Sequence, residues 1–421
     1  MRAGIDPAAA GQAVPRALPR LLVVAARELT QDIRVRRQVV AALEQGMVVE
    51  GLSVVAPGEQ ILPLEGVRVV RVPRGGAGHG GRAPAVAGAG RAGRPAVAVV
   101  ARELRGLYRL ARTARTTIRL VRAARALSPP SIVHANELET LAAGWWLARR
   151  SGARFVYDAH ELHAFLEVDP PRLWRAAVIA GEGALARRAD VVVTNCDAYA
   201  DFLRDTFSLP LRPVVVLNAP ERIDELPEQP GNAARLRAIY QAGPDQPTRP
   251  VSDIVLAAEH APSVEFAIRV VTFDSAAIQR MIDERGLRDR VRILPPVPAD
   301  RLVDGLAGFD VGIILLRPLT TDSRLSQPGK LLEYTMGGLV PVVPDLPGMA
   351  PTVLEHGIGV VYRNDSPAEL GAALERLASN RVLVAEMRGR ARRLALEHFN
   401  FEAEQARLAE AWDIAAVGGD G

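Results

Sequence analysis

The sequence contains one cysteine and one lysine, and aromatic residues make up only 5% of it. Cys196 by itself excludes an internal disulfide and a cysteine-based metal site, so a reduced, cytoplasmic compartment is expected. It follows the apolar run Val191–Thr194 and is expected to be a small buried side chain. No apolar run reaches about 18 residues, the length that would predict a membrane-spanning helix.

Several cofactor motifs are also missing. The first apolar strand leads into Ala26-Arg27-Glu28-Leu29, so the glycine-rich fingerprint of NAD and FAD sites is absent. The sequence has no Walker A loop and no H-E-x-x-H pair. Among the seven histidines only His160 and His163 stand at a metal-ligand spacing, and the sequence offers no identifiable third ligand. Neither a metal nor a cofactor is therefore expected.

Lys330 is the single lysine among 52 basic residues. It follows Ser326-Gln327-Pro328-Gly329, and an apolar-periodic segment continues to Met336. Proline favours a helix start, where exposed N–H groups and the helix dipole attract anions. A compact ammonium group fits close to a phosphate in a tight turn better than the wide guanidinium fork. Glu333, one turn later, is suited to binding a ribose diol, although a chance lysine on a solvated helix start explains the same letters.

The 421 residues predict two domains, each an alternation of apolar strands and helices. The expected strands of the first half are 21–25, 52–56, 67–72, 131–134, 154–158, 191–194 and 214–217, and those of the second are 237–241, 264–271, 291–294, 311–315, 340–343 and 359–362. Continuous Val, Ile and Leu runs with helical connections predict parallel sheets. The expected fold class is α/β, with two tandem doubly wound domains that bind ligands where their strands end.

The domain boundaries follow from this alternation. Residues 1–222 are expected to form the N-terminal domain, with a flexible segment at 75–95 rich in Gly, Pro and Ala, and a long helix at 97–127. Residues 233–398 are expected to form the second domain. Residues 399–421 are expected to form a helix that packs back on the first domain.

The helix at 97–127 is rich in arginine. Its arginines recur every three or four residues and predict one stripe along the helix, comprising Arg102, Arg105, Arg109, Arg112, Arg115, Arg119, Arg122 and Arg125. The stripe is suited to an anionic membrane surface, but a solvated face, or one that meets acidic residues of its own fold, gives the same pattern. Nucleic acid is not expected as a partner, because Tyr108 is the only aromatic residue within the stripe.

A polar cluster, Asp158-Ala159-His160-Glu161-Leu162-His163, follows a predicted strand. The end of a parallel strand is the usual place for ligand-binding side chains in this fold class. A capped helix start would explain the same residues equally well.

Several phrases resemble the GT-B glycosyltransferases, in particular the retaining family four. The N-terminal phrases are Asp32-Ile33-Arg34-Val35-Arg36-Arg37, Val133-His134-Ala135-Asn136-Glu137-Leu138, Val156-Tyr157-Asp158-Ala159-His160-Glu161, Ala189–Thr194 and Val216–Pro220. The C-terminal ones are Tyr240-Gln241-Ala242-Gly243, Pro295–Pro298 and Ser326–Val343, the last similar to the family's "S-x-P-N-K-L-F-E-Y-x-A-x-G-x-P-V-V". The likeness spans nearly the whole chain and implies two Rossmann-like domains that face a cleft.

The resemblance implies a retaining, metal-independent transfer of a sugar from a nucleotide-diphosphate sugar to an acceptor hydroxyl. It implies that Gly243, Arg249, Gly329 and Lys330 bind the donor diphosphate and that Glu333 binds ribose. It also implies a catalytic region formed by Asn136, Glu137, His160 and Ser326. With the arginine stripe, it suggests a cytoplasmic protein that works on the inner face of a membrane.

The sequence departs from the family pattern at several positions, including Asn136, Pro244 and Leu325. Many members carry a histidine where Asn136 stands and arginine where Pro244 stands. Leu325 occupies the place of a sugar-binding glutamate, whose work Ser326 is able to do. These departures leave two alternatives open: a GT-B-like scaffold or partner subunit with weakened catalysis, and a sugar-nucleotide epimerase.

Overall fold

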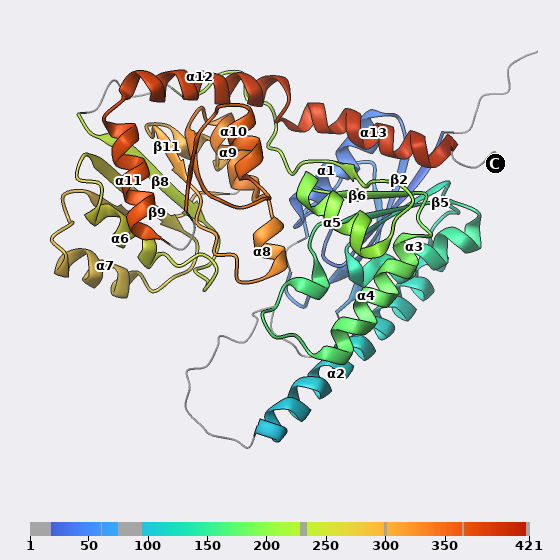
Figure 1. Ribbon diagram of the computed structural model, residues 1–421. Coiled ribbons are helices and arrows are strands. Elements are labelled where there is room, and N and C mark those ends of the chain that lie inside the picture. Colours follow the sequence, from blue (N-terminus) through green and yellow to red (C-terminus); the bar gives the residue numbers. More distant parts are fainter. Residues whose placement is uncertain are drawn as a thin grey trace, which may run out of the picture.

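The computed structural model describes residues 18–59, 61–74, 95–227, 234–298, 301–363 and 366–417. The flexible segment predicted at 75–95 therefore lies outside the described residues, except for Pro95, the first residue of a helix. The described chain folds into two lobes that lie side by side (Figure 1). Each lobe is a parallel sheet covered by helices on both faces, as the sequence predicted.

The N-terminal sheet has seven strands in the order β3-β2-β1-β4-β5-β6-β7. Its strands are β1 (Arg20–Ala25), β2 (Val48–Val55), β3 (Arg68–Pro73), β4 (Ile132–Asn136), β5 (Arg154–Ala159), β6 (Val191–Thr194) and β7 (Val214–Val215). The strand order reverses between β1 and β4. In sheets of this kind, a ligand-binding crevice forms at the carboxyl ends of the two strands where the order reverses. The sequence placed these strands well, although β2 begins at Val48 and β7 ends at Val215.

Helices cover both faces of this sheet. They are α1 (Ile33–Glu44), α2 (Pro95–Ala123, extended by a 3-10 turn at Ala124–Ala126), α3 (Leu138–Ser151), α4 (Arg172–Ala186) and α5 (Asp197–Phe207). The carboxylate of Asp32 caps α1 by accepting from the N–H groups of Arg34 and Val35 at 3.1 and 3.3 Å. This cap fixes where α1 starts, and so fixes which of its side chains point at the end of β5.

The C-terminal sheet has six strands in the order β10-β9-β8-β11-β12-β13. They are β8 (Leu236–Ala242), β9 (Val264–Val270), β10 (Val291–Ile293), β11 (Val311–Ile313), β12 (Val340–Pro344) and β13 (Val360–Tyr362). The surrounding helices are α6 (Ser252–Glu259), α7 (Ser275–Glu284), α8 (Thr321–Leu325), α9 (Gly329–Met336), α10 (Ala350–Glu355), α11 (Pro367–Ala378) and α12 (Arg381–Glu397). The sequence analysis did not single out α12, which buries only Val384, Ala391 and Ala395 and so has little apolar periodicity.

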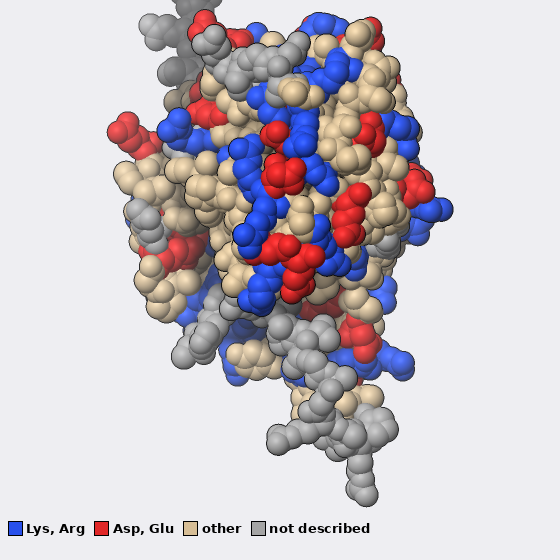
Figure 2. Space-filling model, turned by 90° about the vertical axis from the view of Figure 1, so that its left-hand side faces the viewer, with Lys and Arg blue, Asp and Glu red and all other residues tan. Residues whose placement is uncertain are grey.

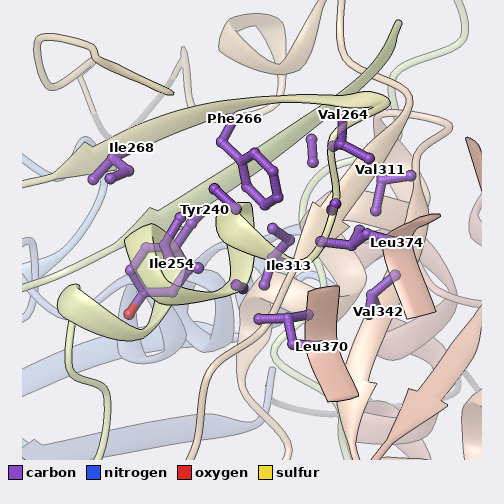
Figure 3. Packing of buried hydrophobic residues seen from close by; sticks show 14 of the residues in the cluster. Tyr240, Ile254, Val264, Phe266, Ile268, Val311, Ile313, Val342, Leu370 and Leu374 are labelled. Carbon is purple, nitrogen blue, oxygen red and sulfur yellow. The ribbon is translucent and has the colours of Figure 1, made fainter. Parts of the chain in front are cut away.

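The C-terminal core packs β-branched and aromatic side chains against α6 and α11. Figure 3 shows Tyr240 and Phe266 beside Ile254 of α6 and Leu370 of α11. Gly312, on the opposite face of β11, is needed because a Cβ there would lie 2.3 Å from the ring of Tyr334. This close approach holds α9 tightly on the sheet.

The last helix, α13 (Phe401–Val417), crosses back to the N-terminal lobe (Figure 1). Phe401, Leu408, Ala411, Trp412 and Ala415 join the core between α1 and the sheet. The N–H of Phe401 donates to the carbonyl of Pro220 at 2.8 Å. The two segments that connect the lobes, one before β8 and one before α13, therefore lie side by side at this point. The indole N–H of Trp412 donates to His134 at 3.1 Å and links α13 to β4.

For part of the arginine stripe of α2, the structure confirms the alternative that the stripe meets acidic residues of its own fold. Arg102 turns inward and pairs with Asp169. Arg109 also turns inward, and its Nη1 lies 2.5 Å from the carboxylate of Glu167. The exposed arginines lie on other faces of the helix and include Arg105, Arg112, Arg115, Arg122 and Arg125. The stripe is divided because α4 and the segment before it pack on one side of α2. Within the described ranges, no helix has the length and apolar character needed to span a bilayer.

Candidate functional site

Polar side chains gather where β4 and β5 end. Asp158 is fully buried and accepts from Arg34 through Nε at 3.0 Å and Nη2 at 2.9 Å. Gln38, one helical turn after Arg34 on α1, donates to the same carboxylate at 2.5 Å. Burial alone would raise the pKa of Asp158, but Arg34 and His160 hold it well below its usual range. Asp158 is therefore a fixed anion at the base of the site.

His160 links Asp158 to Glu137. Its Nε2 lies 3.2 Å from Asp158, and its Nδ1 lies 2.9 Å from Glu137. Burial opposes a charged ring, yet the two carboxylates raise the pKa of His160 to about 10. The imidazole is consequently a cation at neutral pH, held between two anions.

Glu137 also meets a second histidine, His163, whose Nε2 contacts its other carboxylate oxygen. Burial would raise the pKa of Glu137, but the two imidazolium groups hold it well below its usual range. The pKa of His163 is in turn raised well above its usual value, against the effect of burial. Arg34, Glu137, Asp158, His160 and His163 form the group called here the N-terminal charge cluster.

The backbone of Glu137 is strained. Its φ is 70°, one of two positive values among the described non-glycine residues. Strain of this kind costs about 1–3 kcal/mol and is concentrated at functional sites. The conformation turns the Glu137 carboxylate toward His160 and His163, while the neighbouring Asn136 is buried, with its Nδ2 3.4 Å from the carbonyl of Val24.

One group of side chains near this cluster has the donor set of a metal site. Single ligand atoms of Glu137, Glu139 and His163 all lie within 4.8 Å of one another. The sequence offered no third ligand for the histidines, because Glu139 is contributed by α3 and only the fold brings it close. The fit is poor: Glu137 already balances two cationic rings, and a metal would have to displace the proton of His163.

The second group of predicted residues lies at the start of α9. Pro328 caps this helix and Gly329 is its first residue, one position earlier than predicted. Nζ of Lys330 lies 3.1 and 2.8 Å from the two oxygens of Glu333. Both side chains are partly exposed, at 24% and 17%, so the pair is accessible to a ligand.

Gly243 and Arg249 lie in the loop after β8. This loop touches the segment after β11, since the N–H of Arg317 donates to the carbonyl of Thr248 at 2.7 Å. The Nε of Arg249 is buried, and it makes no hydrogen bond to any described residue. A Cβ at Gly243 would meet nothing within 4 Å. The loop therefore holds a buried guanidinium nitrogen without a partner among the described residues, at the carboxyl edge of the C-terminal sheet.

The two lobes meet directly beside α9. Gly329 faces Asn218, whose backbone oxygen would lie 3.5 Å from a Cβ at position 329. Asn218 accepts from Nη1 of Arg37, on α1, at 2.9 Å. Burial lowers the pKa of Arg37, while the charges of Glu221 and Glu333 oppose that effect. A cation of the N-terminal lobe thus stands close to the predicted donor side.

Helix α8 also joins the lobes. Asp322 accepts from the N–H of Leu162 at 3.0 Å and from the hydroxyl of Tyr199 at 2.5 Å. Leu325 packs against the apolar core of the N-terminal lobe, and its carbonyl accepts from the thiol of Cys196 at 3.4 Å. The leucine that departs from the family pattern therefore has a packing role between the domains. Ser326 ends α8 at this contact.

The structure thus brings the predicted residues together in two groups. Asn136, Glu137 and His160 lie at one sheet edge, and Gly329, Lys330 and Glu333 lie on α9. Sequence reasoning had left Asp158 and His163 undecided between a ligand site and a helix cap, and it missed the roles of Arg34 and Arg37. The arginines of the phrase Asp32–Arg37, together with an aspartate at the end of a predicted strand, were the signal in the sequence that could have indicated these roles.

Comparisons with known proteins agree with the two-domain fold. The family model described as Glycosyltransferase Family 4 matches residues 53–219. Two curated relatives are D-inositol 3-phosphate glycosyltransferases, from Streptomyces griseus and Streptomyces avermitilis, 25% and 24% identical over 68% of this chain. The alignments cover 67% and 65% of those proteins, so the chain spans about two thirds of their length.

Solved structures show the same fold. Sucrose-phosphate synthase from Thermosynechococcus elongatus has a TM-score of 0.72 at 14% identity, over 95% of this chain and 100% of the other. HepE of Anabaena in complex with UDP-glucose has a TM-score of 0.63 at 14% identity, over 93% of this chain and 99% of the other. With the family match and the curated relatives, these findings support a group 1 glycosyltransferase with the GT-B fold.

Proposed function

We propose that the protein is a retaining glycosyltransferase that moves a sugar from a nucleotide-diphosphate sugar to an acceptor hydroxyl without a metal. The observation that carries this proposal is the start of α9. There the first N–H groups of the helix, Lys330 and Glu333 lie at the edge of the C-terminal sheet, opposite the N-terminal lobe. A helix start with a lysine suits a diphosphate, and a carboxylate one turn later suits the ribose diol.

The donor would be held by charges that the structure leaves available. Lys330 exchanges its partner Glu333 for the diphosphate, and Glu333 then accepts from the ribose hydroxyls. The guanidinium group of Arg249, in the loop after β8, supplies a second cation. A nucleotide of the UDP type is favoured, because the HepE structures contain UDP and UDP-glucose.

The transfer breaks the bond between the anomeric carbon and the diphosphate oxygen, and forms a bond from the same carbon to the acceptor oxygen. The acceptor proton passes to the leaving phosphate oxygen. Lys330, Arg249 and the α9 amides stabilise the charge that grows on the diphosphate. Attack from the face that the diphosphate leaves keeps the anomeric configuration.

The N-terminal charge cluster would hold the acceptor. Glu137 and His160 present a fixed anion and a fixed cation at the end of β4 and β5, which is suited to orienting hydroxyl groups. No metal is required in this scheme, because cationic side chains and helix N–H groups stabilise the diphosphate, and the charge of Glu137 is already balanced.

A thermal-shift panel of UDP-, GDP- and TDP-sugars tests the donor. A ligand at 100 times its dissociation constant stabilises the folded state by about 2.7 kcal/mol. Proton NMR of the product formed from the preferred donor then reports the anomeric configuration. An inverted product contradicts retention, loss of turnover in EDTA contradicts metal independence, and donor binding without turnover on any acceptor supports the scaffold alternative.

We also propose that the protein works at the cytoplasmic face of an anionic membrane, approached through α2. The outward arginines of this helix, including Arg105, Arg112, Arg115 and Arg122, support this proposal. Sedimentation with anionic vesicles at low salt tests it, and a protein that stays in the supernatant contradicts it.

A further inference from the structure

The outer face of α2 has an apolar ridge as well as arginines. Val100, Leu104, Leu107 and Tyr108 are exposed by 58, 59, 49 and 61%. Their spacing of four, three and one places them along one side of the helix. The N-terminal half of α2 extends away from the body of the lobe (Figure 1). Such a ridge is unusual on a face that meets only water.

The orientation of α2 is fixed by contacts on its opposite face. Gly106 packs so closely on α4 that a Cβ there would lie 2.7 Å from Pro171 and 2.9 Å from Trp174. Glu103 accepts from the first N–H groups of α4, at Arg172 and Leu173. Because this inner face is already packed, the helix cannot turn its ridge inward without breaking these contacts.

On α2 itself, the charged side chains exposed beside the ridge are arginines. Glu103 is the single acidic residue of α2, and it is used on the inner face. The exposed arginines of α2 include Arg105, Arg112, Arg115 and Arg122. The C-terminal lobe is different: seen from the side of α6, α7 and α11, its acidic and basic side chains are intermixed (Figure 2). Exposed arginines beside an apolar ridge are characteristic of helices that lie in an anionic interface.

A second apolar segment lies against α2. Val168 and Leu173 are exposed by 74 and 59%. Val168 stands between Glu167 and Asp169, whose carboxylates pair with Arg109 and Arg102, and the N–H of Leu173 donates to Glu103. This segment begins only a few residues after His163 of the N-terminal charge cluster. The exposed surface and the proposed acceptor site are therefore parts of one continuous stretch of chain.

We propose that the ridge of α2, together with Val168 and Leu173, inserts into the headgroup region of an anionic bilayer, with the outward arginines on the lipid phosphates. The inference rests on the proposed membrane location and goes beyond it, because it requires apolar insertion as well as charge attraction. A second copy of the chain is a poorer occupant, since two such faces would place arginines against arginines.

The experiment is co-sedimentation of the full chain with two kinds of vesicle. One is phosphatidylcholine alone, and the other is phosphatidylcholine with about 30 mol% phosphatidylglycerol. The wild-type protein is expected to bind only the anionic vesicles. Leu104→Gln with Leu107→Gln is expected to weaken the partition about ten-fold, since roughly half-exposed leucines would lose their apolar burial. Each of Arg105→Gln, Arg112→Gln and Arg115→Gln is expected to weaken it about five-fold.

Matched controls come from the C-terminal lobe. Leu354→Gln with Val382→Gln changes two side chains exposed by 63 and 71%, and it should leave binding unchanged. A triple variant removes as much positive charge from the C-terminal lobe as the three α2 variants remove in total, and it should have little effect on vesicle binding. Its changes are Arg280→Gln, Arg288→Gln and Arg292→Gln. Binding of UDP by calorimetry checks that every variant is folded. Hydrogen exchange should show protection of 98–108 and 166–173 by anionic vesicles.

The outcomes distinguish apolar insertion of the ridge from the membrane location itself. If the leucine pair binds like the wild type while the arginine variants fail, the ridge does not insert, although the membrane location stands. If the wild type ignores anionic vesicles at low salt, both are wrong. If it ignores vesicles and forms a dimer that the leucine pair dissolves, the ridge is an interface between copies.

Discussion

The two halves of the candidate site differ in how their charges are balanced. In the N-terminal charge cluster, each charged group has a partner within the fold, and Asp158 and Arg34 are buried. On α9, Lys330 and Glu333 balance each other through a partly exposed pair. The first half is preorganised, whereas the second can exchange its partner for a ligand. Substitutions in the cluster should therefore cost stability, and substitutions on α9 should cost donor binding.

The largest effect is expected for Glu137→Gln. It removes the carboxylate that lies between His160 and His163 and leaves their charges uncompensated. Breaking a buried ion pair costs about 3–5 kcal/mol of unfolding free energy. Urea denaturation at pH 7 measures it, and the added change His163→Gln should recover part of the loss. A cost below about 1 kcal/mol would mean that the cluster is not a charge-balanced unit.

The next effect concerns pH and Glu182, which accepts from the hydroxyl of Tyr157 at 2.8 Å beside the cluster. Burial raises the pKa of Glu182 to about 7, from 4.5. Between these values the native state holds a proton that the unfolded chain has released, so stability falls as pH rises from 4.5 to 7. The fall is up to about 3 kcal/mol, at about 1.4 kcal/mol for each pH unit.

Glu182→Gln removes this titration and keeps an acceptor for Tyr157. Melting temperatures at pH 5 and pH 8 should then lie closer together than in the wild type. Glu404, whose pKa burial also raises to about 7, contributes the same trend, so the double variant with Glu404→Gln should be flatter still. An unaltered pH profile in the double variant would show that neither carboxyl titrates in this range.

Glu333→Gln should have a smaller effect, and on binding instead of stability. The loss of charged hydrogen bonds to ribose should weaken UDP binding by about 2 kcal/mol. The loss of the Lys330 pair should cost the fold no more than about 0.5 kcal/mol. Calorimetry with UDP and with its 2′,3′-dideoxy analogue tests the assignment, and equal losses for both ligands would remove Glu333 from the ribose site.

The smallest effect is expected for Lys330→Arg. The charge is kept, but the wider guanidinium fits the helix start less well, so donor affinity should fall about ten-fold, or about 1.4 kcal/mol. Unfolding free energy should stay within about 0.5 kcal/mol of the wild type, because the pair with Glu333 is partly exposed. Unchanged donor affinity would mean that the single lysine has no special place in the site.

The sequence was most informative where a local rule acts. Strands such as Val191–Thr194 were predicted at their observed bounds, because apolar runs are properties of neighbouring residues. Lys330 and Glu333 were predicted one helical turn apart for the same reason, since they are three residues apart in the sequence. Which arginines of α2 face inward stayed open in the sequence, because the segment before α4 supplies the carboxylates that pair with Arg102 and Arg109.

By itself, the sequence determined the α/β alternation, the two parallel sheets and the helix that follows Pro328, since these depend on short-range propensity and patterning. Only the tertiary structure decided that Asp158 meets Arg34 across 124 residues, that His163 shares Glu137 with His160, and that Leu325 packs on the other domain. Contacts of this kind depend on which strand ends lie side by side. No local pattern encodes that arrangement, because it is fixed by the order of the strands in the folded sheet.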